Sequence, residues 1–353
     1  MKNKLCFLCV YVFILLLFII HNRIFAAEPK YHLMAFTAFR EMKPFPQFMF
    51  SLFVMLASLF VFMFLAVILA IPFFGLSNLM NNLGSIVIGT PEGLAFLKYM
   101  QVIQSIGLFV APALILGWLY HGNFSDYLQL NRTTKFTTYL YAGLSILALI
   151  PLINYIGEIN SQMKLPASLS GLENWMREME ETAKVLTDKF MKVDGISGLL
   201  FNVFMIAVLP AIGEELMFRG VIQRIFTTMT KNYHWGIWIA AFIFSAFHMQ
   251  FYGFLPRLLL GAMFGYLLVW TGTMWAPILA HFVNNTLGVV GYYLIDKGSI
   301  SHDIEQWGTG REELPLVLFS LASVSLLLFL IYRNSIKTKM PDHQIDSQAP
   351  RID

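Results

Sequence analysis

The sequence predicts an all-α fold, a polytopic transmembrane helical bundle of about eight spans with one interfacial amphipathic helix. Composition is the first reason. Hydrophobic residues make up 57% of the 353 residues and charged residues only 13%, about half the charged share of a soluble globular domain. The second reason is that the apolar residues come in blocks of about 20, which is the length that a helix needs to cross about 30 Å of hydrocarbon.

Eight apolar blocks are the predicted spans, and they fill most of the chain after residue 47. Their ranges are 48–74, 99–119, 138–156, 197–222, 235–252, 256–271, 276–295 and 314–332. We expect the fourth helix to continue beyond the membrane to near residue 230.

Lys and Arg are distributed unevenly among the loops between these spans. Loops 121–137 and 223–234 and the tail after residue 332 carry several of them, whereas loop 75–96 has none. Because cytoplasmic loops are enriched in Lys and Arg, we expect both ends of the eight-span body to face the cytoplasm. The predicted location is the cytoplasmic (inner) membrane. The net charge of +3 gives no reason to expect nucleic acid as a partner.

The first 47 residues precede this body, and three interpretations stay open for their apolar stretch 5–20. It follows Lys2 and Lys4, so it could be a signal peptide or a ninth span. The true start could also lie later, at Met34 or Met42. The predicted organisation is 1–47 as this segment and a cytoplasmic lead-in, 48–196 with three spans and an amphipathic insert, 197–295 as a core of four spans, and 296–353 with the last span and a cytoplasmic tail.

Both cysteines, Cys6 and Cys9, lie in this first segment. A disulfide framework, a cysteine metal cluster or a thiol nucleophile is therefore not expected in the main body.

The polar insert at 157–196 contains an amphipathic pattern. The apolar residues that recur at helical spacing are Leu172, Trp175, Met176, Met179, Ala183, Leu186 and Phe190. A helix with one such face and a charged opposite face lies in the membrane interface. We favour a structural surface helix over a helix that guides substrates toward a site.

Three ionisable residues lie inside the fourth apolar block, in the stretch AIGEELMFRG. Glu215 and Arg219 are four residues apart and share a helical face, which suits an ion pair. Glu214 is turned about 100° away from them. Because a charge inside the membrane costs about 3 kcal/mol or more, we expect the pair to fix the helix while Glu214 has a function. The alternative is a buried packing network of all three.

Further polar groups fall deep in later spans. FSAFH places His248 late in the fifth span, with Phe244 one turn earlier, and HFVNN places His281 and Asn285 on one face of the seventh. A single membrane histidine is more often a hydrogen bond between helices. Together with Glu214, these side chains predict a polar chamber inside the bilayer.

Such a chamber suits hydrolysis by either of two mechanisms. A glutamate can take a proton from water while a histidine holds that water, and another histidine and an amide can donate hydrogen bonds to an oxyanion. Alternatively, Glu214, His248 and His281 are a possible zinc ligand set with an open fourth position. The residue types leave both mechanisms open, so the expected cofactor is either none or Zn.

Other chemistries receive little support from the sequence. There is no HExxH helix and no GxGD pair, and GISG at 195–198 matches a rhomboid-type serine motif only weakly, with Ser197 as the candidate. A transporter that uses Glu214 and His248 as a proton relay would be expected to show internal repeats, and no convincing repeat is present.

The three stretches EELMFRG, FSAFH and HFVNN resemble, in this order, the motifs EExxxR, FxxxH and HxxxN of the CPBP family, the CAAX-protease and bacteriocin-processing proteins. The likeness covers roughly residues 197–295. It includes Gly261 and Gly265, a pair of small residues that would allow close helix packing.

The resemblance implies an eight-helix intramembrane endopeptidase that acts on a membrane-associated protein or peptide. Glu214 would activate the water and His248 would be its partner. His281 and Asn285 would be the oxyanion donors, or His281 would be a metal ligand if zinc is used.

For Glu215 and Arg219 the resemblance implies a supporting role. The rival interpretation is a non-catalytic protein of the same fold, a bacteriocin-immunity or membrane scaffold protein that keeps the chamber but binds a partner. Replacement of Glu214 by Gln separates the two, since it should abolish catalysis and spare binding.

Overall fold

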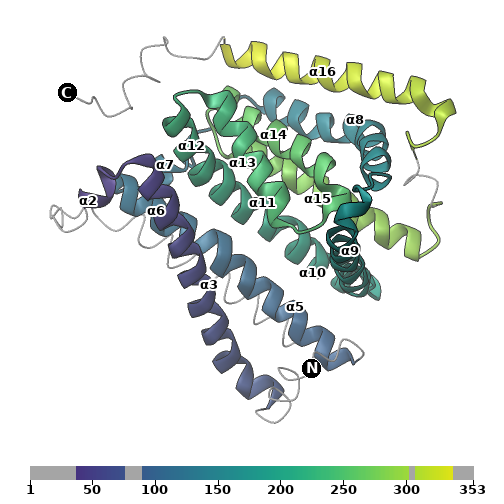
Figure 1. The fold of residues 1–353 in the computed structure, drawn as a ribbon, viewed down its shortest axis with the longest axis horizontal. Coiled ribbons are helices and arrows are strands. Elements are labelled where there is room, and N and C mark those ends of the chain that lie inside the picture. The colour runs from purple at the N-terminus through teal and green to yellow at the C-terminus, as the bar shows by residue number, and fades with distance from the viewer. Residues whose placement is uncertain (1–36, 76–89, 302–306, 337–353) are drawn as a thin grey trace.

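The computed structural model describes residues 37–75, 90–301 and 307–336, and these residues form helices and no β-strand (Figure 1). The predicted all-α class is therefore confirmed. The apolar stretch 5–20 and the tail after residue 336 lie outside the described residues, so the three interpretations of the N-terminal segment stay open.

Seven continuous helical stretches are long and apolar enough to cross a membrane, which makes the chain an integral membrane protein. They are Pro44–Phe74 (α3), Pro91–His121 (α5 to α6), Phe136–Ser161 (α8), Gly195–Thr230 (α10 to α12), Phe251–Thr271 (η6 and α14), Trp275–Asp296 (α15) and Leu314–Ser335 (α16, which ends at Ile336). All seven fall where spans were predicted, and the fourth continues to residue 230 as expected.

The fifth predicted span is the one that differs from expectation. It is the helix α13, Tyr233–Phe247, with 15 residues, a length of about 22 Å. The helix ends because His248 forms its C-cap and Met249 takes a left-handed conformation with φ of 54°. The described residues thus hold seven full spans and one shorter apolar helix, and the short helix brings His248 to its end.

Several spans change their winding along their length. The second comprises α5 (Pro91–Ser105), the π-helical segment η2 (Ile106–Val110) and α6 (Ala111–His121). The fourth comprises α10 (Gly195–Asn202), η4 (Val203–Val208), α11 (Leu209–Glu214), η5 (Glu215–Ile222) and α12 (Gln223–Thr230), where η4 and η5 are π-helical. The remaining short elements are α2 (Thr37–Arg40), α7 (Phe124–Tyr127), η3 (Ala167–Leu169), η6 (Phe251–Gly253) and η8 (Arg311–Glu313), and α14 is Phe254–Thr271. Wide π-turns often occur at functional sites.

The spans pack so that the fourth lies between two groups of helices. On one side α8 contacts α16, α15 and α14, and on the other α3 contacts α5 and η2 (Figure 1). Helix α14 also packs closely on α13, because a Cβ at Gly261 would lie 3.2 Å from atoms of Ala241 and Phe244, and one at Gly265 would lie 2.9 Å from Ile237. The expectation that this glycine pair allows close packing is confirmed.

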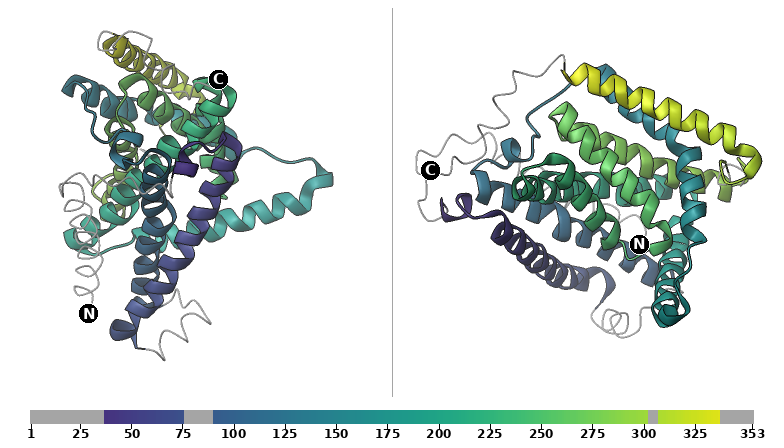
Figure 2. Two further views of the ribbon diagram at one scale, coloured as in Figure 1. Left: turned by 90° about the vertical axis from the view of Figure 1, so that its left-hand side faces the viewer. Right: turned by 45° about the horizontal axis from the view of Figure 1, so that its top comes forward.

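The predicted amphipathic helix is α9, Ser170–Met191, which projects from the bundle (Figure 2). The residues of its predicted apolar face that are buried or half-buried are Met176, Met179, Ala183, Leu186 and Phe190. Leu172 and Trp175 on the same face are exposed. Its C-terminus is held by Lys98 of α5, whose Nζ donates to the carbonyl of Phe190 at 2.8 Å. The helix is therefore attached to the spans as well as amphipathic.

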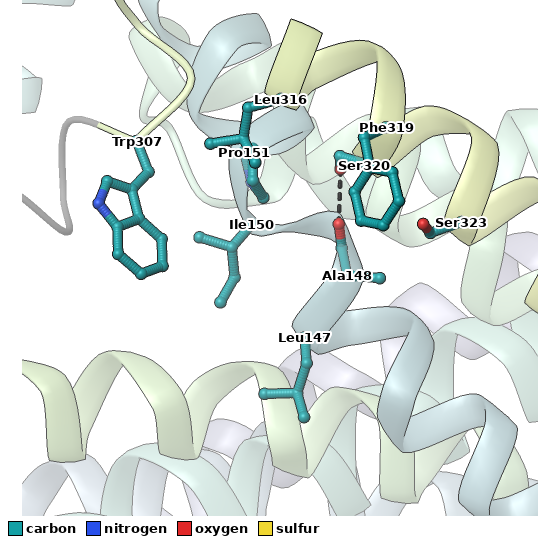
Figure 3. Close-up of a pocket in the computed structure, with 9 residues that line it drawn as sticks. All are labelled: Leu147, Ala148, Ile150, Pro151, Trp307, Leu316, Phe319, Ser320 and Ser323. Carbon is teal, nitrogen blue, oxygen red and sulfur yellow. Dashed lines mark hydrogen bonds between the residues drawn. The ribbon is translucent and has the colours of Figure 1, made fainter. Parts of the chain in front are cut away.

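A groove of about 190 Å³ lies between α8 and α16 (Figure 3). Its lining consists of apolar side chains and two serines: Leu147, Ala148, Ile150, Pro151, Trp307, Leu316, Phe319, Ser320 and Ser323. The Ser320 hydroxyl donates to the carbonyl of Ala148 at 2.5 Å. The carbonyl just before it, that of Leu147, is the one that would accept from residue 151 in a regular helix, and Pro151 has no N–H to donate. None of the predicted site residues lines this groove.

Candidate active site

The ion pair predicted in the fourth span is present where α11 gives way to η5. Arg219 Nη1 lies 2.8 Å from Glu215 Oε1, and the two side chains are 1% and 0% exposed. A buried ion pair needs further hydrogen bonds to offset its desolvation. The surroundings supply one such bond to each partner, from Gly261 and from His281, whereas Oε2 of Glu215 has no hydrogen-bond partner among the described residues.

Arg219 is held from the sixth span. Its Nη2 donates to the carbonyl of Gly261 at 3.1 Å, and its guanidinium lies 4.4 Å from the ring centre of Phe244 and 5.4 Å from that of Phe264. Such cation–π contacts stabilise a desolvated guanidinium. Gly261 thus provides a hydrogen-bond acceptor in addition to the close packing predicted for it.

Glu215 is held from the seventh span, a contact that the sequence did not indicate. His281 Nδ1 lies 2.7 Å from Glu215 Oε1, and because a carboxylate can only accept, Nδ1 carries the proton. The imidazole is stacked on Phe264 with ring centres 5.1 Å apart. This leaves Nε2 of His281 pointing toward Glu214.

Glu214 has a different environment from its neighbour. Its side chain is 12% exposed, and His281 Nε2 lies 3.9 Å from its Oε2. That distance is too long for a direct hydrogen bond, and no other described residue donates a hydrogen bond to Glu214. A carboxylate is thereby kept nearly buried with both oxygens available.

His248 lies at the end of α13 and is half-buried. Its Nδ1 lies 2.8 Å from the carbonyl of Phe244, so this nitrogen also carries a proton and Nε2 is left available. His248 interacts electrostatically with Glu214 and His281. The predicted group of Glu214, His248 and His281 is therefore in one region, without a direct hydrogen bond from His248 to either partner.

Asn285, one turn after His281 on α15, reaches back to the fourth span. Its Nδ2 donates to the carbonyl of Ile206 at 3.0 Å. This carbonyl lies four residues before Pro210, which has no N–H to satisfy it in a regular helix. Its Oδ1 accepts from Asn284 at 3.1 Å. The carbonyl of Ile206, which Pro210 leaves without its helical donor, thus orients the side-chain amide of Asn285. One of the two N–H groups of this amide stays available for another acceptor.

Glu214, His248 and His281 are also the zinc ligand set that the sequence predicts as an alternative. In the part of the chain that the structure describes, no group of three or more His, Cys, Asp or Glu side chains is placed to hold a metal ion. The histidines do have their Nδ1 protons fixed by acceptors, as ligands in metal sites have. The present spacing of Glu214, His248 and His281 nevertheless does not fit a three-ligand site.

A further charged residue near this region was not singled out from the sequence. Arg257 lies in the first turn of α14, is half-buried, and interacts electrostatically with Glu214 and with Glu180 of α9. The signal that could have found it is the rule applied to Arg219, an ionisable residue inside an apolar span.

The serine alternative gains no support from the structure. Ser197 lies exposed in the first turn of α10. The acceptors of the Nδ1 protons of His248 and His281 are Phe244 and Glu215, so neither histidine is paired with this hydroxyl through that nitrogen.

Comparison with known families matches residues 196–287 to the family described as Type II CAAX prenyl endopeptidase Rce1-like. A curated relative, "Uncharacterized protein YpbD" of Bacillus subtilis (strain 168), is 30% identical over 86 residues, which are 23% of this chain and 41% of that protein. The chain thus aligns with about two fifths of its relative's length. No solved structure matches. The matched range contains every predicted site residue, from Glu214 to Asn285.

Proposed function

Because residues 196–287 form an Rce1-like type II CAAX prenyl endopeptidase (CPBP) family domain, we propose that this integral membrane protein is an intramembrane endopeptidase. Its reaction is the hydrolysis of a peptide bond in a membrane-associated protein or peptide. The observation that carries the proposal is the contrast between two adjacent glutamates, one neutralised by Arg219 and His281 and the other left free.

Glu214 is the proposed general base. Its carboxylate takes a proton from a water molecule, and the water oxygen attacks the carbonyl carbon of the scissile peptide bond. The same proton then passes to the leaving nitrogen as the C–N bond breaks, so the products are an amine and a carboxylic acid, which releases its proton to solvent. Glu214 Oε2 and His281 Nε2 are 3.9 Å apart, a distance that a water molecule can bridge.

His248 is the proposed partner of Glu214 in holding this water. Its Nδ1 proton is committed to the carbonyl of Phe244, so the neutral ring presents the lone pair of Nε2 to a water proton. The electrostatic interaction between His248 and Glu214 supports their action on one molecule.

His281 and Asn285 are the proposed oxyanion donors. Glu215 accepts the Nδ1 proton of His281 and stabilises positive charge on the ring, as the carboxylate of a hydrolase triad does. In its imidazolium form, His281 donates from Nε2. Asn285 contributes the N–H that Ile206 does not use, and both donors come from successive turns of α15.

The experiment that tests the proposal compares the termini of membrane proteins in cells that carry the native chain and cells that carry Glu214→Gln. New termini that are present with the native chain and absent with the variant are expected, and they identify the substrate. Unchanged termini, with equal amounts of both proteins in the membrane, would favour the immunity or scaffold interpretation.

A further inference from the structure

Arg257 is an ionisable group beside the site that the proposed hydrolysis does not use. It lies in the first turn of α14, where the N-terminal end of the helix dipole disfavours a positive charge. A half-buried arginine in an apolar span is costly unless it has a partner. Its present contacts therefore bear on its function.

The guanidinium is held in place by the turn that follows His248. Arg257 Nη1 donates to the carbonyl of Gln250 at 2.9 Å, and Nη2 donates to its Oε1 at 2.8 Å. Gly253 allows this arrangement, because a Cβ there would lie 2.5 Å from Nη2. Ser245 fixes the base of the turn by donating to the carbonyl of Phe254 at 2.7 Å. The charged group is thus oriented before any ligand arrives.

Both acceptors of Arg257 are neutral, in contrast to those of Arg219. Among the described residues, no carboxylate oxygen lies within 4.0 Å of its guanidinium, whereas Arg219 has Glu215 at 2.8 Å. Glu180 of α9, which interacts electrostatically with Arg257, accepts from the backbone N–H of Tyr252 at 3.2 Å. Arg257 is therefore a fixed cation without an anionic partner at hydrogen-bonding distance.

We propose that Arg257 binds a carboxylate of the peptide substrate and so selects substrates by charge. The inference rests on the proposed peptidase function. Arginine pairs with carboxylates through parallel N–H bonds, and Gln250 leaves further N–H donors of this group unused. The carboxylate is either the C-terminus of the substrate or an acidic side chain near the cleaved bond, since both present the same chemistry.

The test uses the full chain reconstituted in vesicles of phosphatidylethanolamine and phosphatidylglycerol. The probe is a randomised library of membrane-inserting peptides in two series, one with a free C-terminal carboxylate and one with a carboxamide. Each series is divided into peptides with and without Asp or Glu. Mass spectrometry gives the rate of cleavage in each class.

The native chain should cleave carboxylate-bearing peptides at least about tenfold faster than their uncharged counterparts. Arg257→Gln should bring this ratio close to one. Arg257→Lys keeps the positive charge but lacks the planar guanidinium that can bind a carboxylate through two N–H groups, so it should give an intermediate ratio. This variant provides the test if Arg257→Gln does not fold stably. The matched control is Arg333→Gln, at an exposed arginine near the end of α16, which should leave the ratio unchanged.

A preference between the acid and amide series assigns the C-terminus as the ligand, and a preference within each series assigns an acidic side chain. A native ratio near one, or a ratio that is the same in both Arg257 variants as in the native chain, would overturn the inference and leave the peptidase function standing. Absence of cleavage of every peptide class by the native chain would overturn both.

Discussion

Glu214 and Glu215 are neighbours in the chain but belong to two different halves of the site. Glu215 belongs to an anchored half, in which it is bonded to Arg219 and His281, and Glu214 belongs to an open half, in which its oxygens are available. Glu215 is fully buried, and its Oε1 is shared by Arg219 at 2.8 Å and His281 at 2.7 Å. Glu214 has no donor among the described residues and reaches His281 only at 3.9 Å. Two identical side chains are therefore distinguished by their partners and by their burial.

The difference separates stability from chemistry. The anchored half ties the fourth, sixth and seventh spans together, because Arg219 also bonds to Gly261 and Glu215 also bonds to His281. In the open half, Glu214 receives no hydrogen bond from a described residue, so its oxygens stay available. Substitutions in the two halves should therefore have different kinds of effect.

The largest expected effect on activity is that of Glu214→Gln. Loss of the general base should lower the rate of cleavage by a factor on the order of 10²–10⁴. The thermal unfolding temperature in detergent should remain close to that of the native chain, since no described residue donates a hydrogen bond that Glu214 would lose. A marked drop in the unfolding temperature would show that Glu214 stabilises the fold as Glu215 does, and it would contradict the division of the site into two halves.

Glu215→Gln should instead destabilise the fold by about 3–5 kcal/mol, because it leaves Arg219 as an unpaired buried charge. Thermal unfolding of the purified protein measures this. In the double variant Glu215→Leu with Arg219→Met, both charges are gone and stability should largely return. Cleavage should stay impaired, since His281 has lost its acceptor, and full activity in the double variant would contradict the role given to Glu215.

Asn285→Ala should have a smaller, mixed effect. It removes a proposed oxyanion donor, which costs a factor on the order of 10²–10³ in rate, and it leaves the carbonyl of Ile206 unsatisfied, which costs about 1–3 kcal/mol of stability. Comparing Asn285→Ala with and without Pro210→Ala separates the two effects.

Alanine at position 210 restores an N–H that can reach Ile206, so the second background should recover stability without recovering the rate. If the rate returns together with the stability, Asn285 acts on the fold and not on the reaction.

The smallest expected effect is that of metal removal. The described residues do not form a three-ligand site, so dialysis against a chelator should leave the rate of cleavage unchanged. The zinc content of the protein, measured at the same time, verifies depletion. Loss of activity that returns on addition of Zn²⁺ would show that Glu214, His248 and His281 rearrange into the alternative ligand set.

The features that sequence spacing predicted are those that depend on local geometry. The seven long spans and the pair of Glu215 with Arg219 follow from apolar block length and from helical periodicity. The amphipathic face of α9 follows from the same periodicity, although Leu172 and Trp175 on that face are exposed.

The features that were missed depend on contacts between distant segments. The bond between His281 and Glu215 joins residues far apart in the chain, so no spacing rule could reveal it. The shortness of α13 results from the left-handed conformation of Met249, which its residue type does not favour. The bond of Asn285 to Ile206 had an indirect signal, since Pro210 frees that carbonyl, but only the structure identifies the donor.

The most direct test of the division between the two halves is the rate of peptide-bond cleavage by reconstituted Glu214→Gln, measured on a substrate found from the cellular termini and normalised to the folded fraction. Loss of cleavage by a factor on the order of 10²–10⁴, in a protein that unfolds at the native temperature, is the expected result. Cleavage at the native rate in a fully folded Glu214→Gln protein would contradict the assignment of Glu214 as the base.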